Sequence, residues 1–420
     1  MKKYYAFASA LLFASLIGCQ EKEDPIVEEP NFGETESEWV RLALWNENSK
    51  LGLLNPVSEE FAQPDLPAFS TTSANYVTSS GRYIVSMERA EGNVRFFDSG
   101  LENHSDHGHA YSPKWLSATA VAPLPTHFSS TSGNIVIFND GDGSVTLARE
   151  TNMETPSFTP TIISGLGNGV HHGAATWLKG NKLAVTFKDE GTEGSLPQRV
   201  KLLDLSGDLI SENEEVSVTG IHGDASNGDF AVFGATEGVV VAGADDQIKL
   251  IANPSPLEST SGNWMGTIKG NDNISKFYGY ASQQGIFEID PIANTIKPIF
   301  LSNNIKTYLL SADGGHLIVQ TKDNVVKVFD TTSGIELASK PVTVAENVNA
   351  GARKAGDELE HYRMMNEENP VLTASENFLY VLEADKTKIH VRNLKTLNTV
   401  AIMDAPSGTV NLARVGFQTK

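Results

Sequence analysis

Short runs of β-branched and aromatic residues, each preceded by a Gly, Asn, Asp or Ser turn, recur along the chain from Trp39 onward. Such runs are typical of strands, which are expected at 83–87, 134–138, 182–187, 230–233, 316–319 and 378–382. Hardly any stretch keeps the period of an amphipathic helix long enough to predict one. The pattern therefore predicts an all-β fold.

The strand pattern repeats roughly every 40 to 50 residues, because most runs are followed by a turn and a second strand. Repeats are expected around residues 76–99, 115–150, 160–207, 215–253, 263–300, 304–340 and 366–402. A four-stranded unit of this length is typical of a β-propeller blade, and residues 40–45 could add a strand that closes the ring. The sequence thus predicts one seven-bladed β-propeller domain over residues 39–420. Two stacked β-sandwiches explain the repeat less well.

The N-terminal residues 1–18 have the pattern of a secretory signal peptide, with Lys2 and Lys3 before a short apolar run. Residues 16–19 (Leu-Ile-Gly-Cys) resemble a bacterial lipobox, which implies that Cys19 is diacylated and anchored in a membrane. Residues 19–38 are rich in Glu, Asp and Pro and predict a disordered acidic tether. An extracytoplasmic protein is expected, on the outer membrane facing the periplasm, with cell-surface display left open.

Composition limits the chemistry of the folded part. Cys19 is the only cysteine, so no disulfide and no thiolate ligand are expected there. The formal charge is -20, and loss of Lys2 and Lys3 with the signal peptide makes it about -22. Such an acidic protein is not expected to bind nucleic acid. A transition-metal site would have to use nitrogen and oxygen ligands.

A short polar loop at residues 103–109 holds three of the ten histidines. His104, His107 and His109 lie there together with Asp106. Neutral imidazole nitrogen and carboxylate oxygen are common zinc ligands. A solvated polar loop is the alternative, but the density of histidines favours a metal site.

Four further histidines lie where three successive predicted blades begin. His127 follows a Pro-Thr pair, His171 and His172 lie in the glycine-rich stretch 169–175, and His222 lies in 219–225. Equivalent positions in neighbouring blades should bring these side chains to one region near the ring axis. We expect one zinc ion there, bound by His127, His172 and His222, with His171 as an optional fourth ligand. Each histidine alone would more often be a buried side chain bonded to backbone.

Other polar positions are expected to have structural roles or remain unassigned. His316 and His390 lie in ordinary strand sequence and are expected only to pack, whereas His361, in the acidic insert 345–365, is unassigned. Residues 140–143 (Asp-Gly-Asp-Gly) suggest a calcium loop but lack its remaining oxygen ligands, so they predict a hairpin turn.

Taken together, these motifs resemble the AztD family of periplasmic zinc metallochaperones. The motifs occur in the same order over most of the folded part, at 104–111, 125–127, 140–143, 171–173 and 220–225. The resemblance implies a monomeric β-propeller, not an enzyme, that binds zinc through histidines and passes it to the solute-binding protein of a zinc ABC importer. The chain departs from the family pattern in two ways. Thr219 and Ala235 stand where the resemblance implies cysteines, and a lipobox is unusual for a freely diffusing chaperone.

Two other classes of function fit the same histidines. In a metal-dependent hydrolase or lyase they would act as general bases or hold a catalytic metal, although no nucleophile motif stands out. In a surface-anchored interaction scaffold they would be structural. A zinc titration separates the scaffold from the metal-binding alternatives.

Overall fold

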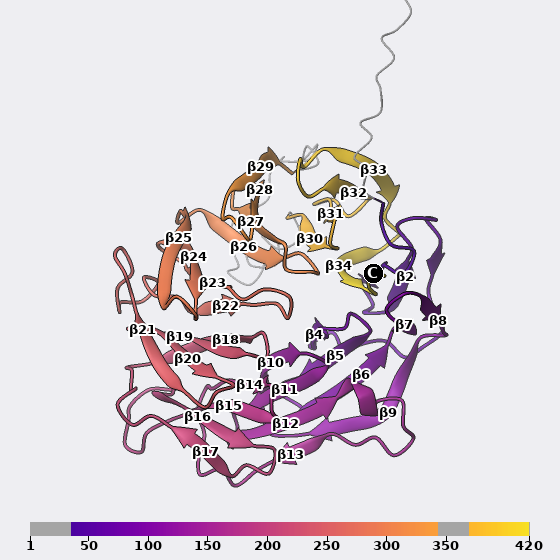
Figure 1. Ribbon diagram of the computed structural model, residues 1–420. Coiled ribbons are helices and arrows are strands. Elements are labelled where there is room, and N and C mark those ends of the chain that lie inside the picture. Colours follow the sequence, from indigo (N-terminus) through magenta and orange to yellow (C-terminus); the bar gives the residue numbers. More distant parts are fainter. Residues whose placement is uncertain (1–34, 343–368, 420) are drawn as a thin grey trace, which may run out of the picture. The chain divides into compact units, whose positions relative to one another are not determined.

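The structure, a computed structural model, describes residues 35–342 and 369–419. These residues form eight four-stranded sheets arranged as blades around a central axis (Figure 1). The predicted all-β propeller is confirmed. The predicted number of blades is wrong, because the ring has eight blades and not seven.

Seven blades are continuous in the sequence, apart from one hairpin inserted in the first, and each runs from its innermost to its outermost strand. The first blade consists of β4 (Ala74–Val77), β5 (Tyr83–Glu88), β6 (Asn93–Asp98) and β9 (Lys114–Val121). The second consists of β10 (Pro125–Thr131), β11 (Asn134–Asn139), β12 (Ser144–Arg149) and β13 (Thr161–Ile163). The third consists of β14 (Ala175–Leu178), β15 (Lys182–Phe187), β16 (Arg199–Asp204) and β17 (Leu209–Glu212). The fourth consists of β18 (Ile221–Ser226), β19 (Phe230–Ala235), β20 (Gly238–Gly243) and β21 (Ile248–Ala252).

The remaining continuous blades follow the same order. The fifth consists of β22 (Thr267–Lys269), β23 (Phe277–Ala281), β24 (Gly285–Asp290) and β25 (Thr295–Leu301). The sixth consists of β26 (Ile305–Leu310), β27 (His316–Thr321), β28 (Val325–Asp330) and β29 (Glu336–Pro341). The seventh consists of β30 (Val371–Ala374), β31 (Phe378–Leu382), β32 (Lys388–Asn393) and β33 (Thr399–Asp404).

The eighth blade joins the two ends of the described chain. Its innermost strand is β34 (Thr409–Val415), followed by β1 (Arg41–Asn46), β2 (Leu51–Leu54) and β3 (Phe61–Ala62). Ala43 of β1 pairs with Ala413 of β34, so the ring closes through main-chain hydrogen bonds. The sequence predicted a closing strand at 40–45 but no eighth repeat, because this blade is divided between distant parts of the chain.

The hydrophobic core lies between neighbouring blades. All six residues of β11 are buried, as are all six of β20, because the middle strands of a blade are covered on both faces. Phe138 of the second blade packs with Val185 of the third, and both are fully buried. Burial of one such side chain contributes roughly 1.5–3 kcal/mol.

The two faces of the ring are defined by the direction of the innermost strands. We call the face where these strands begin the start face and the opposite one the end face. On the end face, the backbone N–H of Ser79, after β4, donates to Ser130 at 2.9 Å, and that of Ser132, after β10, donates to Asp272 at 2.7 Å. On the start face, Arg89 between β5 and β6 reaches Asp140 after β11. Opposite ends of a six-residue strand are separated by roughly 17–20 Å.

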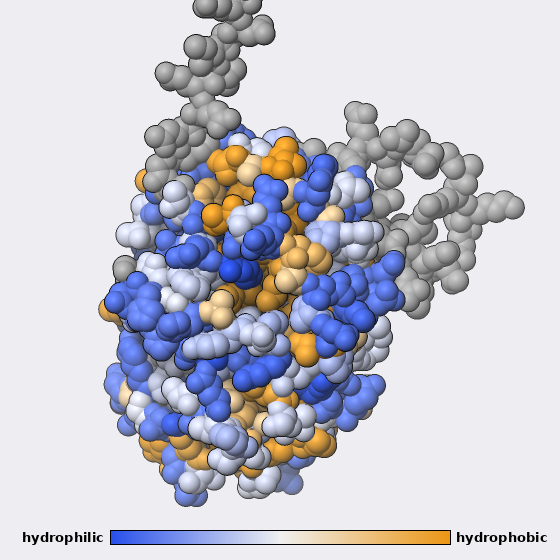
Figure 2. All heavy atoms as spheres, turned by 90° about the vertical axis from the view of Figure 1, so that its right-hand side faces the viewer, coloured by the Kyte–Doolittle hydropathy of each residue, from blue (hydrophilic) through white to orange (hydrophobic). Residues whose placement is uncertain are grey.

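The ring begins slightly before Trp39. Tyr380 donates a hydrogen bond to Glu36, and Trp39 stacks on Phe417 with ring centroids 6.0 Å apart. The predicted signal peptide, Cys19 and most of the acidic tether lie outside the described residues, as does His361. Within the described ranges, no helix has the length and apolar character needed to span a membrane. Figure 2 shows hydrophobic and polar residues intermixed over one side of the ring, which is ordinary for a protein surface.

Candidate metal centre

Three imidazoles converge on the start face. His127 lies on β10, His172 lies just before β14, and His222 lies on β18. The Nε2 atom of His172 is 3.2 Å from that of His127 and 3.1 Å from that of His222. Across residues 35–342 and 369–419, this is the only group of three or more metal-ligating side chains with ligand atoms within 4.8 Å of one another. Nitrogens bound to one tetrahedral zinc at 2.0–2.1 Å would be about 3.4 Å apart, so the spacing fits a zinc ion.

Hydrogen bonds at the far side of two rings fix where their lone pairs point. His172 Nδ1 lies 2.8 Å from a carboxylate oxygen of Asp140, and His222 Nδ1 lies 2.7 Å from the carbonyl oxygen of Gly266. Both oxygens can only accept, so both Nδ1 atoms carry the proton. In the neutral rings the two Nε2 atoms are then lone-pair acceptors facing each other at 3.1 Å. This arrangement is repulsive unless a proton or a metal ion lies between them.

The third imidazole is held in its neutral form. Burial, followed by the nearby His172 and His222, lowers the pKa of His127 to about 4. A neutral imidazole is the metal-binding form. At neutral pH, protons therefore do not compete for the His127 nitrogen.

Asp140 is a residue of this site that sequence reasoning missed. The predicted hairpin turn at 140–143 is confirmed between β11 and β12, but Asp140 also bonds both His172 and Arg89, the latter at 3.0 Å. Burial would raise the pKa of Asp140, but hydrogen bonds from His172, Arg89 and Thr126 outweigh it and keep the pKa below its ordinary value. An ionised carboxylate behind a histidine raises the basicity of the ligand and fixes its orientation. No spacing in the sequence connects these three blades.

Main-chain contacts from the loop between β15 and β16 support two of the three ligands. The backbone N–H of His172 donates to Ser195 O at 2.8 Å, and that of Ile221, next to His222, donates to Pro197 O at 2.9 Å. Gly223 has a φ of +76°, and a Cβ there would lie 2.6 Å from the Gly266 oxygen. Glycine thus allows the two neighbouring innermost strands to approach closely beside the histidines.

His171 lies apart from this group. Its ring packs on Phe138 with centroids 4.8 Å apart, and its Nδ1 is 3.3 Å from Gly169 O. Its Nε2 is buried without a hydrogen-bond partner within the described residues. Burial lowers the pKa of His171. The structure thus places this side chain in the core between two blades.

The histidine-rich loop is a short hairpin inserted in the first blade, between β6 and β9. Its strands are β7 (Leu101–Asn103) and β8 (Gly108–Ala110). The ring centroids of its three histidines are 5.0–5.2 Å apart, and Asp106 bonds His107 at 2.7 Å, with its side chain 84% exposed. A Cβ on Gly108 would meet Trp39 at 2.5 Å, so the base of the hairpin is packed against the ring.

The hairpin and the three converging imidazoles lie on opposite faces. The hairpin follows the end of β6, where Arg82 bonds Asp98 at 3.0 Å and lies 3.4 Å from Glu102. Arg82 itself follows the end of β4, which places this region on the end face. The two groups of histidines therefore cannot share one ion.

The two remaining described histidines are buried. His390 bonds Glu383 at 2.6 Å inside the seventh blade, and His316 begins β27 of the sixth. Neither belongs to the group of converging ligands.

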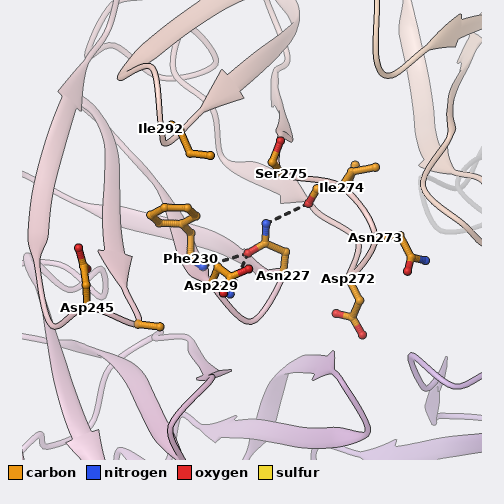
Figure 3. A pocket seen from close by; sticks show the side chains of 10 residues that line it. Asn227, Asp229, Phe230, Asp245, Asp272, Asn273, Ile274, Ser275 and Ile292 are labelled. Atoms are coloured by element: carbon orange, nitrogen blue, oxygen red, sulfur yellow. Dashed lines mark hydrogen bonds between the residues drawn. The ribbon is translucent and has the colours of Figure 1, made fainter.

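A cavity of about 590 Å³, whose lining residues are drawn in Figure 3, lies at the ends of the innermost strands β18 and β22, which is the end face. Phe230, Ile274 and Ile292 line it together with Asp229 and Asp272. Asp229 is paired with Lys179 at 2.8 Å. The cavity contains no histidine and is separate from the candidate metal centre.

Comparison with known proteins also finds similarity to a zinc-binding protein. No protein-family model matches the chain. It is 21% identical over 358 residues to the zinc chaperone AztD of Citrobacter koseri, which covers 82% of this chain and 79% of that protein. This chain resembles AztD. The apo structure of Citrobacter koseri AztD has a TM-score of 0.72 at 18% identity, and a second crystal structure has 0.72 at 19%; each comparison covers 91% of this chain and 99% of AztD.

At 18–19% sequence identity, the structural similarity shows that this chain and AztD share a fold. The resemblance recognised from the sequence motifs is thus confirmed by comparison of both sequence and structure. The two positions that depart from the AztD-like pattern lie beside the candidate metal centre. Ala235 pairs with Ile221 across β18 and β19, and Thr219 precedes that strand.

Proposed function

We propose that this protein is an extracytoplasmic zinc metallochaperone that binds one zinc ion through His127, His172 and His222. The observation that carries the proposal is the convergence of three imidazoles, with Nε2 of His172 3.1 Å from that of His222 and 3.2 Å from that of His127. The similarity to the zinc chaperone AztD supports zinc as the ion that this group binds.

Three nitrogen ligands leave the fourth tetrahedral position for water or for a ligand of an acceptor protein. The side chain of His172 is 30% exposed, so the ion is within reach of solvent. An acceptor can then bind the ion before the three histidines release it. We propose that this acceptor is the solute-binding protein of a zinc ABC importer, and that the chain acts as a monomer.

A second, weaker site is proposed on the hairpin, with His104, His107 and His109 as ligands and Asp106 in support. Their rings lie within 5.2 Å of one another on an exposed hairpin. Exposed ligands lose side-chain entropy on binding and are less pre-organised than the start-face group, so faster exchange is expected. Because the two sites lie on opposite faces, each exchanges zinc with solvent or a partner independently.

The sequence of residues 1–19 supports the proposed location. A signal peptide and lipidated Cys19 would place the ring outside the cytoplasm on a membrane, where an importer's binding protein operates.

The direct test is a zinc titration of the untagged protein against a chromophoric chelator, together with elemental analysis. We expect one tight equivalent, which is lost when His127, His172 and His222 are all changed to alanine. Unchanged binding in this triple variant would refute the site, and no binding by the natural protein at submicromolar zinc would favour the scaffold alternative. Transfer is tested by mixing zinc-loaded protein with the candidate importer binding protein in excess chelator. Delivery to that protein ahead of the chelator is the expected result.

A further inference from the structure

The main chain that leads into His222 is held at Gly220, through both the N–H and the carbonyl oxygen of that residue. Gly220 N–H donates to the hydroxyl of Thr236 at 3.1 Å, and Gly220 O accepts from the backbone N–H of Thr236 at 3.0 Å. Thr236 lies at the end of the neighbouring strand β19 and is 8% exposed. Two residues after Gly220, the His222 ring is fixed at its other end by Gly266.

The carboxylate of Glu237 bonds both Thr219, which precedes Gly220, and Thr236, which holds Gly220. It accepts hydrogen bonds from the Thr219 backbone N–H at 3.0 Å, from the Thr219 hydroxyl and from the Thr236 hydroxyl. Because Thr236 uses its hydroxyl proton on Glu237, its oxygen lone pair is free to accept from Gly220 N–H. Hydrogen bonds to an ionised acceptor are about twice as strong as neutral ones. Glu237 therefore orders both threonines and, through them, the chain before His222.

We infer that Glu237 and Thr219 form a clamp that positions the His222 imidazole and thereby sets how firmly the start-face site holds its metal ion. The inference rests on the proposed function. Glu237 touches neither the ion nor the imidazole, so it is a positioning residue. Thr219 is also one of the two positions where the AztD-like pattern implies a cysteine. Here hydrogen bonds to Glu237, and not a disulfide, hold this stretch of the chain.

The test uses the full chain and isosteric substitutions. Glu237→Gln replaces one accepting oxygen with a donor, and Thr219→Val removes the hydroxyl at constant shape. Each is expected to speed zinc release about 3- to 10-fold, below the 10- to 100-fold typical of groups that bond a ligand directly. Thr219→Ser keeps the hydroxyl and should release zinc like the natural protein. Glu212→Gln is the matched control, because Glu212 pairs with Lys201 at 2.7 Å on the outer strand of the neighbouring blade.

Cobalt(II) gives the readout that a merely structural role would not change. Its visible absorption reports ligand geometry, so Glu237→Gln and Thr219→Val should alter the spectrum whereas Thr219→Ser and Glu212→Gln should not. If Glu237→Gln releases zinc at the rate of the natural protein and has the same cobalt spectrum, the inference about Glu237 is overturned while the proposed function stands. Equal loss in Thr219→Ser and Thr219→Val would also overturn the inference. Absence of zinc binding by the natural protein would instead remove the proposed function itself, and the inference with it.

Discussion

The Nδ1 atom of His172 lies 2.8 Å from a carboxylate oxygen of Asp140, although the two residues belong to neighbouring blades. This contact fixes the imidazole so that its Nε2 lone pair faces His222, and the candidate metal centre is therefore built from several blades. The carboxylate is in turn held by Arg89 from the first blade. The ligand geometry therefore depends on the packing of three successive blades.

Asp140→Asn should weaken zinc binding about 10- to 100-fold, because the amide removes the charge that supports His172. Competition with a chromophoric chelator measures the affinity. Asp142→Asn, an exposed position in the same turn, serves as the control and should bind zinc normally. Equal affinities in the two variants would show that Asp140 does not support the ligand.

The metal-free protein should lose stability as the pH falls from about 6.5 to about 4. Burial and the two neighbouring imidazoles lower the pKa of His127 to about 4, whereas the unfolded chain protonates this side chain near 6.5. Between these values the unfolded state binds more protons, so the contribution of His127 to stability is complete above pH 6.5 and declines below it. Thermal melts of chelator-treated protein should show a smaller decline in His127→Gln. His109→Gln, on the exposed hairpin, should keep the natural slope.

Asp224 should make the stability of the folded protein depend on pH in the opposite direction. Burial raises the pKa of this carboxyl to about 7, and its Oδ2 has no hydrogen-bond partner within the described residues. The folded state then binds the proton more tightly than the unfolded state, so stability falls as the pH rises from about 3.8 to about 7. Asp224→Asn should therefore melt at a higher temperature than the natural protein at pH 8. The exposed control Asp208→Asn should not, and equal melting temperatures for all three proteins would contradict the prediction.

His171→Phe should bind zinc with natural stoichiometry and affinity. The side chain packs on Phe138 in the core, and its buried Nε2 has no partner there to lose among the described residues. Both His171→Phe and His172→Phe are titrated with zinc, and only His172→Phe should lose the tight equivalent. Loss of the tight equivalent in His171→Phe would place His171 in the ligand shell after all.

Alanine at His104, His107 and His109 should remove one weak equivalent and leave the tight one unchanged. The reason is the separation of the hairpin from the start-face histidines across the ring. Combination with His222→Ala should give additive losses in calorimetric titration. A change in the affinity of the tight site in the hairpin variant would contradict independent sites.

The local sequence pattern by itself determined the strands of this protein and their grouping into blades. Alternating apolar runs with turns specify strands and blades, because strand periodicity and turn chemistry are local. Equivalent positions in repeated blades predicted that His127, His172 and His222 would lie together. Tertiary structure alone decided the eighth blade, whose strands β1 and β34 come from opposite ends of the described chain, and the separation of the hairpin from the candidate metal centre. It also decided that His171 turns into the core while His172 turns to Asp140. Adjacent residues in a chain point in different directions, and only packing between blades determines which one reaches the site.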